Sequence, residues 1–301
     1  MPFPPLLVVR NSLSFVLFPN PFSVIESIYL PSTLPFLSDF LSVEITDLSE
    51  SIVLITMSGK TATQSFSMEF LPQIADSINQ ALSDPKIKAI VLTGEGKFFS
   101  AGADINSFAK AIEENNAPKL IRDLTGILHP LVMKMRQSST ICVAAINGAC
   151  AGGGLGLALA CDVRVGSSQA KIAASYSGMG LSPDGGTTWL LPRLVGGQIS
   201  RRFFLENSVW DAQKCLHHGV LDELVEDSEL ITKSRELAEL WSSWGEHTKE
   251  ATKHLLDVQS THDFETHLKH ERTLIEAAGT TKEFKEGVSA FLEKRKPKWS
   301  K

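Results

Sequence analysis

The sequence has 301 residues, 43% of them hydrophobic and 21% charged, which is enough apolar material for the buried core of a globular protein. A net charge of −5 lacks the basic character that nucleic-acid binding needs, so we expect no nucleic-acid partner. The four cysteines form no C-x-x-C pair and no zinc-finger spacing, so we expect buried, reduced thiols and no metal site.

Residues 1–41 differ from the rest of the chain, because the first forty residues contain seven of the fourteen prolines and little charge. They lack the basic start and the small-residue cleavage site of a signal peptide, and their longest uncharged run is too short to span a bilayer. We therefore predict an extension that is poorly ordered or a start-site artefact. We expect a cytoplasmic protein with no integral membrane segment, and organelle targeting by this extension stays open as the alternative.

The elements after residue 42 follow a regular order. Short, β-branched apolar segments predict buried strands at 51–57, 88–94 and 141–147. Helical spacing of apolar residues predicts helices at 66–84, with Pro72 in the first turn, and at 117–136. This alternation favours an α/β fold with parallel strands joined by right-handed crossovers.

From about residue 198 onward nearly every segment has a helical pattern, and we expect no further strand pairs there. The predicted organisation is therefore an extension over 1–41, an α/β core over 42–197 and a helical C-terminal region over 198–301.

A glycine-rich stretch, residues 152–156, opens a helix directly after the third strand. It fails the dinucleotide-binding pattern G-x-G-x-x-G/A, and no Gly-Lys-Ser/Thr of a phosphate-binding loop is present. Glycines at the start of a helix let a ligand approach unpaired N–H groups at its positive end, which suits an oxyanion. Close packing of the helix on the strand is the alternative. A second loop of small residues, 98–105, also follows a strand and favours the oxyanion interpretation.

Three motifs carry a resemblance to a known family: KFFSAGADI (97–105), AAINGACAGGGLGLALACD (144–162) and GLSPDGGTTWLLPRLVG (180–196). With them, residues 44–299 resemble the crotonase, or enoyl-CoA hydratase/isomerase, superfamily. The resemblance implies an α/β spiral of ββα and βαβ units with a helical C-terminal trimerisation region. It also implies a homotrimer or a dimer of trimers, an acyl-CoA thioester substrate of fatty acid metabolism, and no cofactor beyond the coenzyme A of that substrate.

The resemblance also assigns roles to particular residues. It implies that the backbone N–H groups of Ala103 and Gly153 form the oxyanion hole for the thioester carbonyl. It implies a set of residues that contact coenzyme A or the acyl group: Ala101, Asp104, Ile105, Asn106, Tyr176 and Trp189.

Hydratases of this family use two glutamates, at positions where this chain has Gly156 and Tyr176. Asp184 stands where several isomerases of the family carry their acid/base, and it has one alternative role, as a turn residue that caps the following helix. We expect an enoyl-CoA isomerase that shifts a C=C bond from the 3- to the 2-position, with Asp184 moving the proton. The alternatives are an enoyl-CoA hydratase or ring-derived CoA ester isomerase, and a non-catalytic acyl-CoA-binding scaffold.

Overall fold

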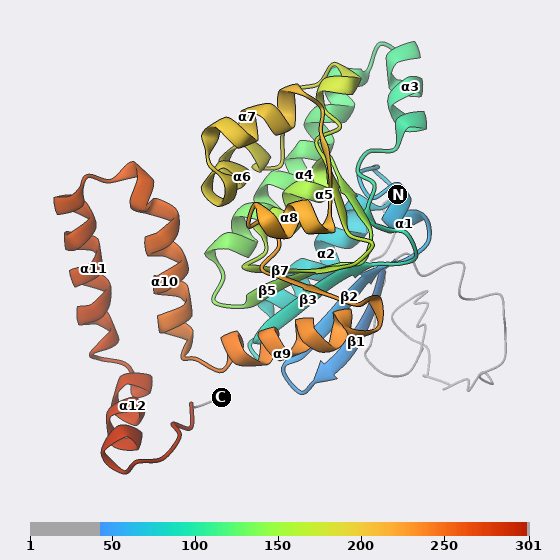
Figure 1. Cartoon of the computed structure of the whole chain (residues 1–301). Helices are drawn as coiled ribbons and strands as arrows, with labels where there is room; N and C mark the ends of the chain where they lie inside the picture. The colour runs from blue at the N-terminus through green and yellow to red at the C-terminus, as the bar shows by residue number, and fades with distance from the viewer. Residues whose placement is uncertain (1–42, 300–301) are drawn as a thin grey trace, which may run out of the picture. The chain divides into compact units, whose positions relative to one another are not determined.

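The computed structural model describes residues 43–299 (Figure 1). The prediction for the extension over 1–41 lies outside these residues. The described chain has a mixed α/β fold with two sheets, which confirms the predicted fold class.

The larger sheet has six strands in the order β1-β2-β3-β5-β7-β10. Its strands are β1 Val43–Ser49, β2 Ile52–Met57, β3 Ala89–Gly94, β5 Ile141–Ile146, β7 Val163–Ser167 and β10 Glu223–Val225. All neighbours are parallel except β1 and β2, which form an antiparallel pair. The three strands expected from the sequence are therefore confirmed as β2, β3 and β5.

The smaller sheet has four strands in the order β4-β6-β8-β9. Its strands are β4 Phe98–Ser100, β6 Ala149–Ala151, β8 Lys171–Ala173 and β9 Val209–Asp211. Each of β3, β5 and β7 is followed along the chain by a strand of this smaller sheet, so the chain winds as a spiral that visits both sheets in every turn.

The helices are α1 Lys60–Thr63, α2 Leu71–Ser83, α3 Ile105–Glu113, α4 Ala117–Gln137, α5 Gly153–Ala160, α6 Thr187–Val195, α7 Gly197–Leu205, α8 Ala212–His217, α9 Leu230–Ser242, α10 Glu246–Val258, α11 Phe264–Ala278 and α12 Lys282–Leu292. Short 3₁₀ turns are η1 Ser177–Met179, η2 Asp227–Glu229 and η3 Gln259–Thr261. In the part of the chain that the structure describes, no helix is both long and apolar enough to cross a bilayer.

Two expectations about these elements are wrong. Strands β9 and β10 follow residue 198, where we expected none, and they complete the two sheets. Helix α2 begins at Leu71 and not at Phe66, although Pro72 does lie in its first turn as predicted. Phe66 instead forms a bridge with Ala103, a pairing between loops that no local pattern predicts.

The central strands β3, β5 and β7 of the larger sheet are buried on both faces. Alternate residues of each strand point to opposite sides, so each strand contributes to two cores. On β3, Ala89 and Val91 pack in the core beneath α9, whereas Ile90 and Leu92 pack in the larger core on the other side. Helix α9 covers the first face and helices α2, α4 and α5 lie across the second (Figure 1).

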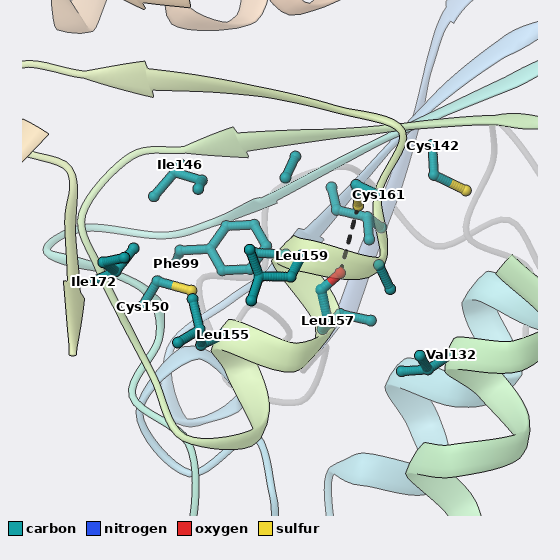
Figure 2. Packing of buried hydrophobic residues seen from close by; sticks show 14 of the residues in the cluster. Phe99, Val132, Cys142, Ile146, Cys150, Leu155, Leu157, Leu159, Cys161 and Ile172 are labelled. Atoms are coloured by element: carbon teal, nitrogen blue, oxygen red, sulfur yellow. Dashed lines mark hydrogen bonds between the residues drawn. The ribbon is translucent and has the colours of Figure 1, made fainter. Parts of the chain in front are cut away.

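Helix α5 runs through the larger core and is buried along its whole length from Gly154 to Ala160. Figure 2 shows its residues Leu155 and Leu159 beside Phe99, Cys150 and Ile172 of the smaller sheet. A helix enclosed on all sides has little freedom to shift, so its first turn is held firmly in place.

The four cysteines are free, buried thiols, as predicted. Burial, followed by the nearby Asp162 carboxylate, raises the pKa of Cys142 to about 12. Burial also raises the pKa of Cys215 to about 12. Because the thiolate is the reactive form, these side chains serve as packing residues and are poor nucleophiles at neutral pH.

A buried charge network joins α10 to the core. Lys253 Nζ donates to Asp162 Oδ2 at 3.0 Å and to the carbonyl oxygens of Met135 and Thr140 at 3.1 and 3.3 Å. The same Asp162 oxygen accepts the backbone N–H of Cys142 at 2.8 Å. Asp162 therefore has a structural role, because its carboxylate joins α10 to the start of β5.

Replacing Lys253 by Met is expected to lower the free energy of unfolding by about 3–5 kcal/mol, because it leaves the buried Asp162 carboxylate without its closest cation. Urea denaturation measures the change. Lys269→Met is the control, since it removes an exposed ion pair with Glu265 that contributes little. Equal stability losses in the two variants would contradict a structural role for the Lys253 pair.

Candidate active site

The first loop of the site follows β4 and contains Ala103. The Phe66 N–H donates to the Gly102 carbonyl at 3.0 Å, and the Asp104 N–H donates to the Phe66 carbonyl at 3.4 Å. Both bonds use the neighbours of Ala103, so the Ala103 N–H itself has no hydrogen-bond partner within residues 43–299.

The second loop is the start of α5, where Gly153 is the first helical residue after Gly152. The N–H groups of Leu155 and Gly156 donate to the Gly152 carbonyl at 3.1 and 3.3 Å. The Gly153 N–H makes no such bond to the chain that the structure describes. It is one of the unpaired donors at the positive end of a helix, which favours an anionic oxygen.

Phe66 holds the two loops together. Its backbone pairs with Ala103, and its ring lies so close to Gly153 that a Cβ there would be 2.6 Å from the ring atom Cε1. Ser100 adds a second link, because its hydroxyl bonds the Ser65 hydroxyl at 2.8 Å and lies 2.3 Å from where a Cβ on Gly154 would stand. The spacing between the two unpaired N–H groups is therefore fixed by packed, buried atoms.

Asp184 lies in the turn before α6. The Tyr176 hydroxyl donates to its Oδ1 atom at 2.8 Å, and its Oδ2 atom is 3.9 Å from Nε2 of His129. The Asp184 carbonyl accepts the N–H and the hydroxyl of Thr187 at 3.1 and 2.9 Å. The backbone of Asp184 therefore forms the turn. Its side chain, which is 31% exposed, contacts Tyr176 and lies near His129.

The helix-cap role considered for the Asp184 carboxylate is wrong. Helix α6 begins at Thr187 after Gly186 and has no side-chain cap. The carboxylate instead lies between a buried tyrosine and a half-exposed histidine, one on each oxygen.

Tyr176 is suited to be a permanent hydrogen-bond donor. Burial, followed by the negative charge of Asp184, raises the pKa of its hydroxyl well above the usual range. The hydroxyl therefore keeps its proton at neutral pH and orients Oδ1, whereas Oδ2 accepts no hydrogen bond from the residues that the structure describes.

A close backbone contact ties the Asp184 turn to helix α5. A Cβ on Gly156 would be 2.6 Å from the carbonyl oxygen of Gly185 and 3.1 Å from its Cα. Only glycine fits at position 156, because the neighbour is backbone that cannot rotate away. The carboxylate is therefore positioned relative to the same helix that presents the Gly153 N–H.

The residues predicted to contact coenzyme A differ in exposure and in hydrogen bonding. The Asp104 carboxylate caps α3 by accepting the N–H groups of Asn106 and Ser107, each at 3.2 Å. Ile105 and Asn106 are exposed, and the Ala101 N–H donates to the Ala62 carbonyl at 2.8 Å. Their role toward coenzyme A stays a prediction.

Of the two aromatic residues predicted at the acyl pocket, the structure brings only Tyr176 into contact with Asp184. Trp189 is exposed on α6, with the Arg193 guanidinium carbon 3.2 Å from the centroid of its ring. Its role in lining a pocket stays a prediction.

The sequence motifs did not reveal two residues of the site. Phe66 lies in a segment with helical spacing, and its contact with Gly153 comes from packing between distant segments. His129 is part of the helical pattern of α4, and no motif relates it to the Asp184 turn.

Comparisons with known proteins agree with this architecture. The family pattern described as enoyl-CoA hydratase/isomerase matches residues 47–301. A 1,2-epoxyphenylacetyl-CoA isomerase of Escherichia coli is 30% identical over 251 residues, which are 83% of this chain and 95% of that protein. A crotonyl-CoA hydratase of Syntrophomonas wolfei is 28% identical over 248 residues, or 82% of this chain and 94% of that protein.

Among crystal structures, an enoyl-CoA hydratase from Bacillus anthracis superimposes with a TM-score of 0.78 at 27% identity, covering 86% of this chain and 99% of that one. The fold is thus that of the crotonase superfamily. Within it, the chain belongs to the enoyl-CoA hydratase/isomerase family.

Proposed function

We propose that this chain is an enoyl-CoA isomerase that moves a C=C bond of an acyl-CoA from the 3- to the 2-position. The observation that carries the proposal is the setting of Asp184. Its Oδ1 is held by Tyr176, and its turn packs on Gly156. Asp184 is the only acid among the family positions 156, 176 and 184, and these contacts orient its side chain.

The chemistry needs one base and one oxyanion hole. The Asp184 carboxylate removes a proton from C2, and the electron pair of that C–H bond moves into the thioester carbonyl to give a dienolate. The N–H groups of Ala103 and Gly153 stabilise the developing negative charge on the carbonyl oxygen. The Asp184 carboxylic acid then returns a proton to C4, and the electrons move back to form the C2=C3 bond.

Water addition by the two-glutamate route is disfavoured by the same residues. Gly156 has no side chain, and the backbone of Gly185 occupies the space that a side chain there would need. Tyr176 supplies a hydroxyl that donates to Asp184 and keeps its proton. Neither position can therefore activate a water molecule as a carboxylate does.

The test is to offer 3-enoyl-CoA and 2-enoyl-CoA to the wild type and to Asp184→Asn, following both double-bond migration and hydration. Migration by the wild type that is lost in the variant is the expected result. Hydration without migration would favour a hydratase that uses Asp184 with a bound water. Binding of acyl-CoA without turnover of any ester tried would favour the non-catalytic scaffold.

A second candidate is the isomerisation of ring-derived CoA esters. It is favoured by the 30% identity to the E. coli 1,2-epoxyphenylacetyl-CoA isomerase over nearly all of that protein. A panel that adds cyclic unsaturated CoA esters to the straight-chain substrates separates the two candidates by their kcat/KM values.

We also propose the homotrimer or dimer of trimers implied by the family. Large apolar side chains stay exposed on α11 and α12, among them Phe264, Ile275 and Phe291. Contact with further copies of the chain removes such surface from water. The molar mass in solution, measured by light scattering, is expected to be three or six times that of the chain, and a monomer would contradict this assembly.

A further inference from the structure

His129 is the second titratable side chain at the Asp184 carboxylate, and the proposed mechanism has no role for it. It lies on α4, with Nε2 3.9 Å from Asp184 Oδ2. The Gly185 N–H donates to the same Nε2 atom at 3.4 Å. The histidine therefore lies near the carboxylate oxygen that Tyr176 does not bind.

The two neighbours of Asp184 differ in what they can do with a proton. Tyr176 is buried and is a donor only, since its raised pKa keeps the proton on its hydroxyl. His129 accepts a hydrogen bond at Nε2, so this atom carries a lone pair that can take up a proton. Half of the His129 side chain is exposed, so the residue is in contact with solvent as well as near the carboxylate.

We propose that His129 carries protons between Asp184 and solvent during the reaction. This inference rests on the proposed isomerase function, and His129 acts through Asp184 rather than on the substrate. The Oδ2–H bond of the protonated acid breaks, and the proton forms a bond to Nε2, which releases the Gly185 N–H. The resulting imidazolium gives up this proton to water, takes up a solvent proton and returns it to Oδ2, so that Asp184 is again the acid that protonates C4.

The 3.9 Å separation is longer than a hydrogen bond, so the relay requires the half-exposed ring to move toward Oδ2. Such contacts commonly tighten when a substrate binds. Proton exchange at neutral pH is the chemistry for which imidazole is best suited.

The relay has a consequence that can be measured apart from the reaction rate. Without it, the proton taken from C2 stays on Asp184 and is returned to C4 of the same molecule. With it, a solvent proton replaces the substrate proton during the lifetime of the dienolate. The origin of the hydrogen at C4 therefore reports on His129.

The experiment uses 3-enoyl-CoA carrying deuterium at C2, in ordinary water, with mass spectrometry of the product before one turnover is complete. One of the two C2 deuterons is transferred to Asp184, and we expect the wild type to lose most of this transferred label to water. We expect His129→Gln to retain severalfold more, because the glutamine oxygen still accepts the Gly185 N–H but cannot carry a proton. His217→Gln, the same change on α8, is expected to lose label as the wild type does.

A second variant separates proton transfer from positioning. In His129→Ala, free imidazole added to the buffer is expected to restore the loss of label, which a purely structural defect would not allow. Equal label loss in the wild type and His129→Gln, with isomerisation intact, would overturn the relay and leave the isomerase proposal standing. Full retention of label by the wild type would overturn it as well. Isomerisation that survives in Asp184→Asn would instead refute the role of Asp184 on which the relay rests, and a wild type that shifts no double bond would refute the underlying function.

Discussion

Asp184→Asn is expected to lower kcat/KM for double-bond migration by about a hundred- to ten-thousandfold, the usual contribution of one general acid–base group. The amide oxygen can still accept the Tyr176 hydroxyl at the Oδ1 position, so the shape of the site is kept. What is lost is the group that takes the proton from C2 and returns it to C4.

The matched control is Asp211→Asn. Asp211 caps α8 by accepting the Lys214 N–H at 2.8 Å, and asparagine is an equally good cap, so activity and thermal unfolding are expected to stay at wild-type values. Activity of Asp184→Asn within about tenfold of the wild type would mean that another group moves the proton.

Gly156→Ala is expected to reduce isomerase activity by about a hundredfold although it alters neither the acid nor the oxyanion donors, because misplacing a catalytic group by about 1 Å has effects of that size. The added Cβ would stand 2.6 Å from the Gly185 carbonyl oxygen, so the turn that carries Asp184 must move. We expect kcat to fall more than KM rises, since the displaced group acts on the reacting carbons.

Gly126→Ala is the control for this change. Gly126 lies in α4 with open space where its Cβ would be, so alanine is expected to stabilise the protein by about 0.5–1 kcal/mol and to leave activity unchanged. Steady-state kinetics and urea denaturation measure the two effects. Wild-type activity in Gly156→Ala would show that the turn yields without moving the carboxylate.

The sequence predicted the parts of the fold that local patterns encode. Strands β2, β3 and β5 are continuous apolar runs, and helix α4 has a helical period along its whole length. Strands β9 and β10 were not predicted, because each has only three residues, too few to show a two-residue period. Both form by pairing with strands that are distant in the chain.

The same distinction holds for the site. The unpaired N–H at Gly153 and the turn at Asp184 follow from glycines and a helix start, which are local signals. Phe66 and His129 reach the site only through tertiary packing between segments distant in the chain. The sequence therefore predicted which chemical groups are present, and folding determines which side chains surround them.

Because Gly156 lies against Gly185, the backbone that positions an acid at 184 leaves no room for an acidic side chain at 156. A glutamate introduced at position 156 alone would collide with the backbone beside Asp184 and displace the acid already there. Conversion of this scaffold to two-glutamate hydration therefore cannot begin at position 156 without moving the turn that carries Asp184, so a redesign has to change the turn over 182–186 together with helix α5.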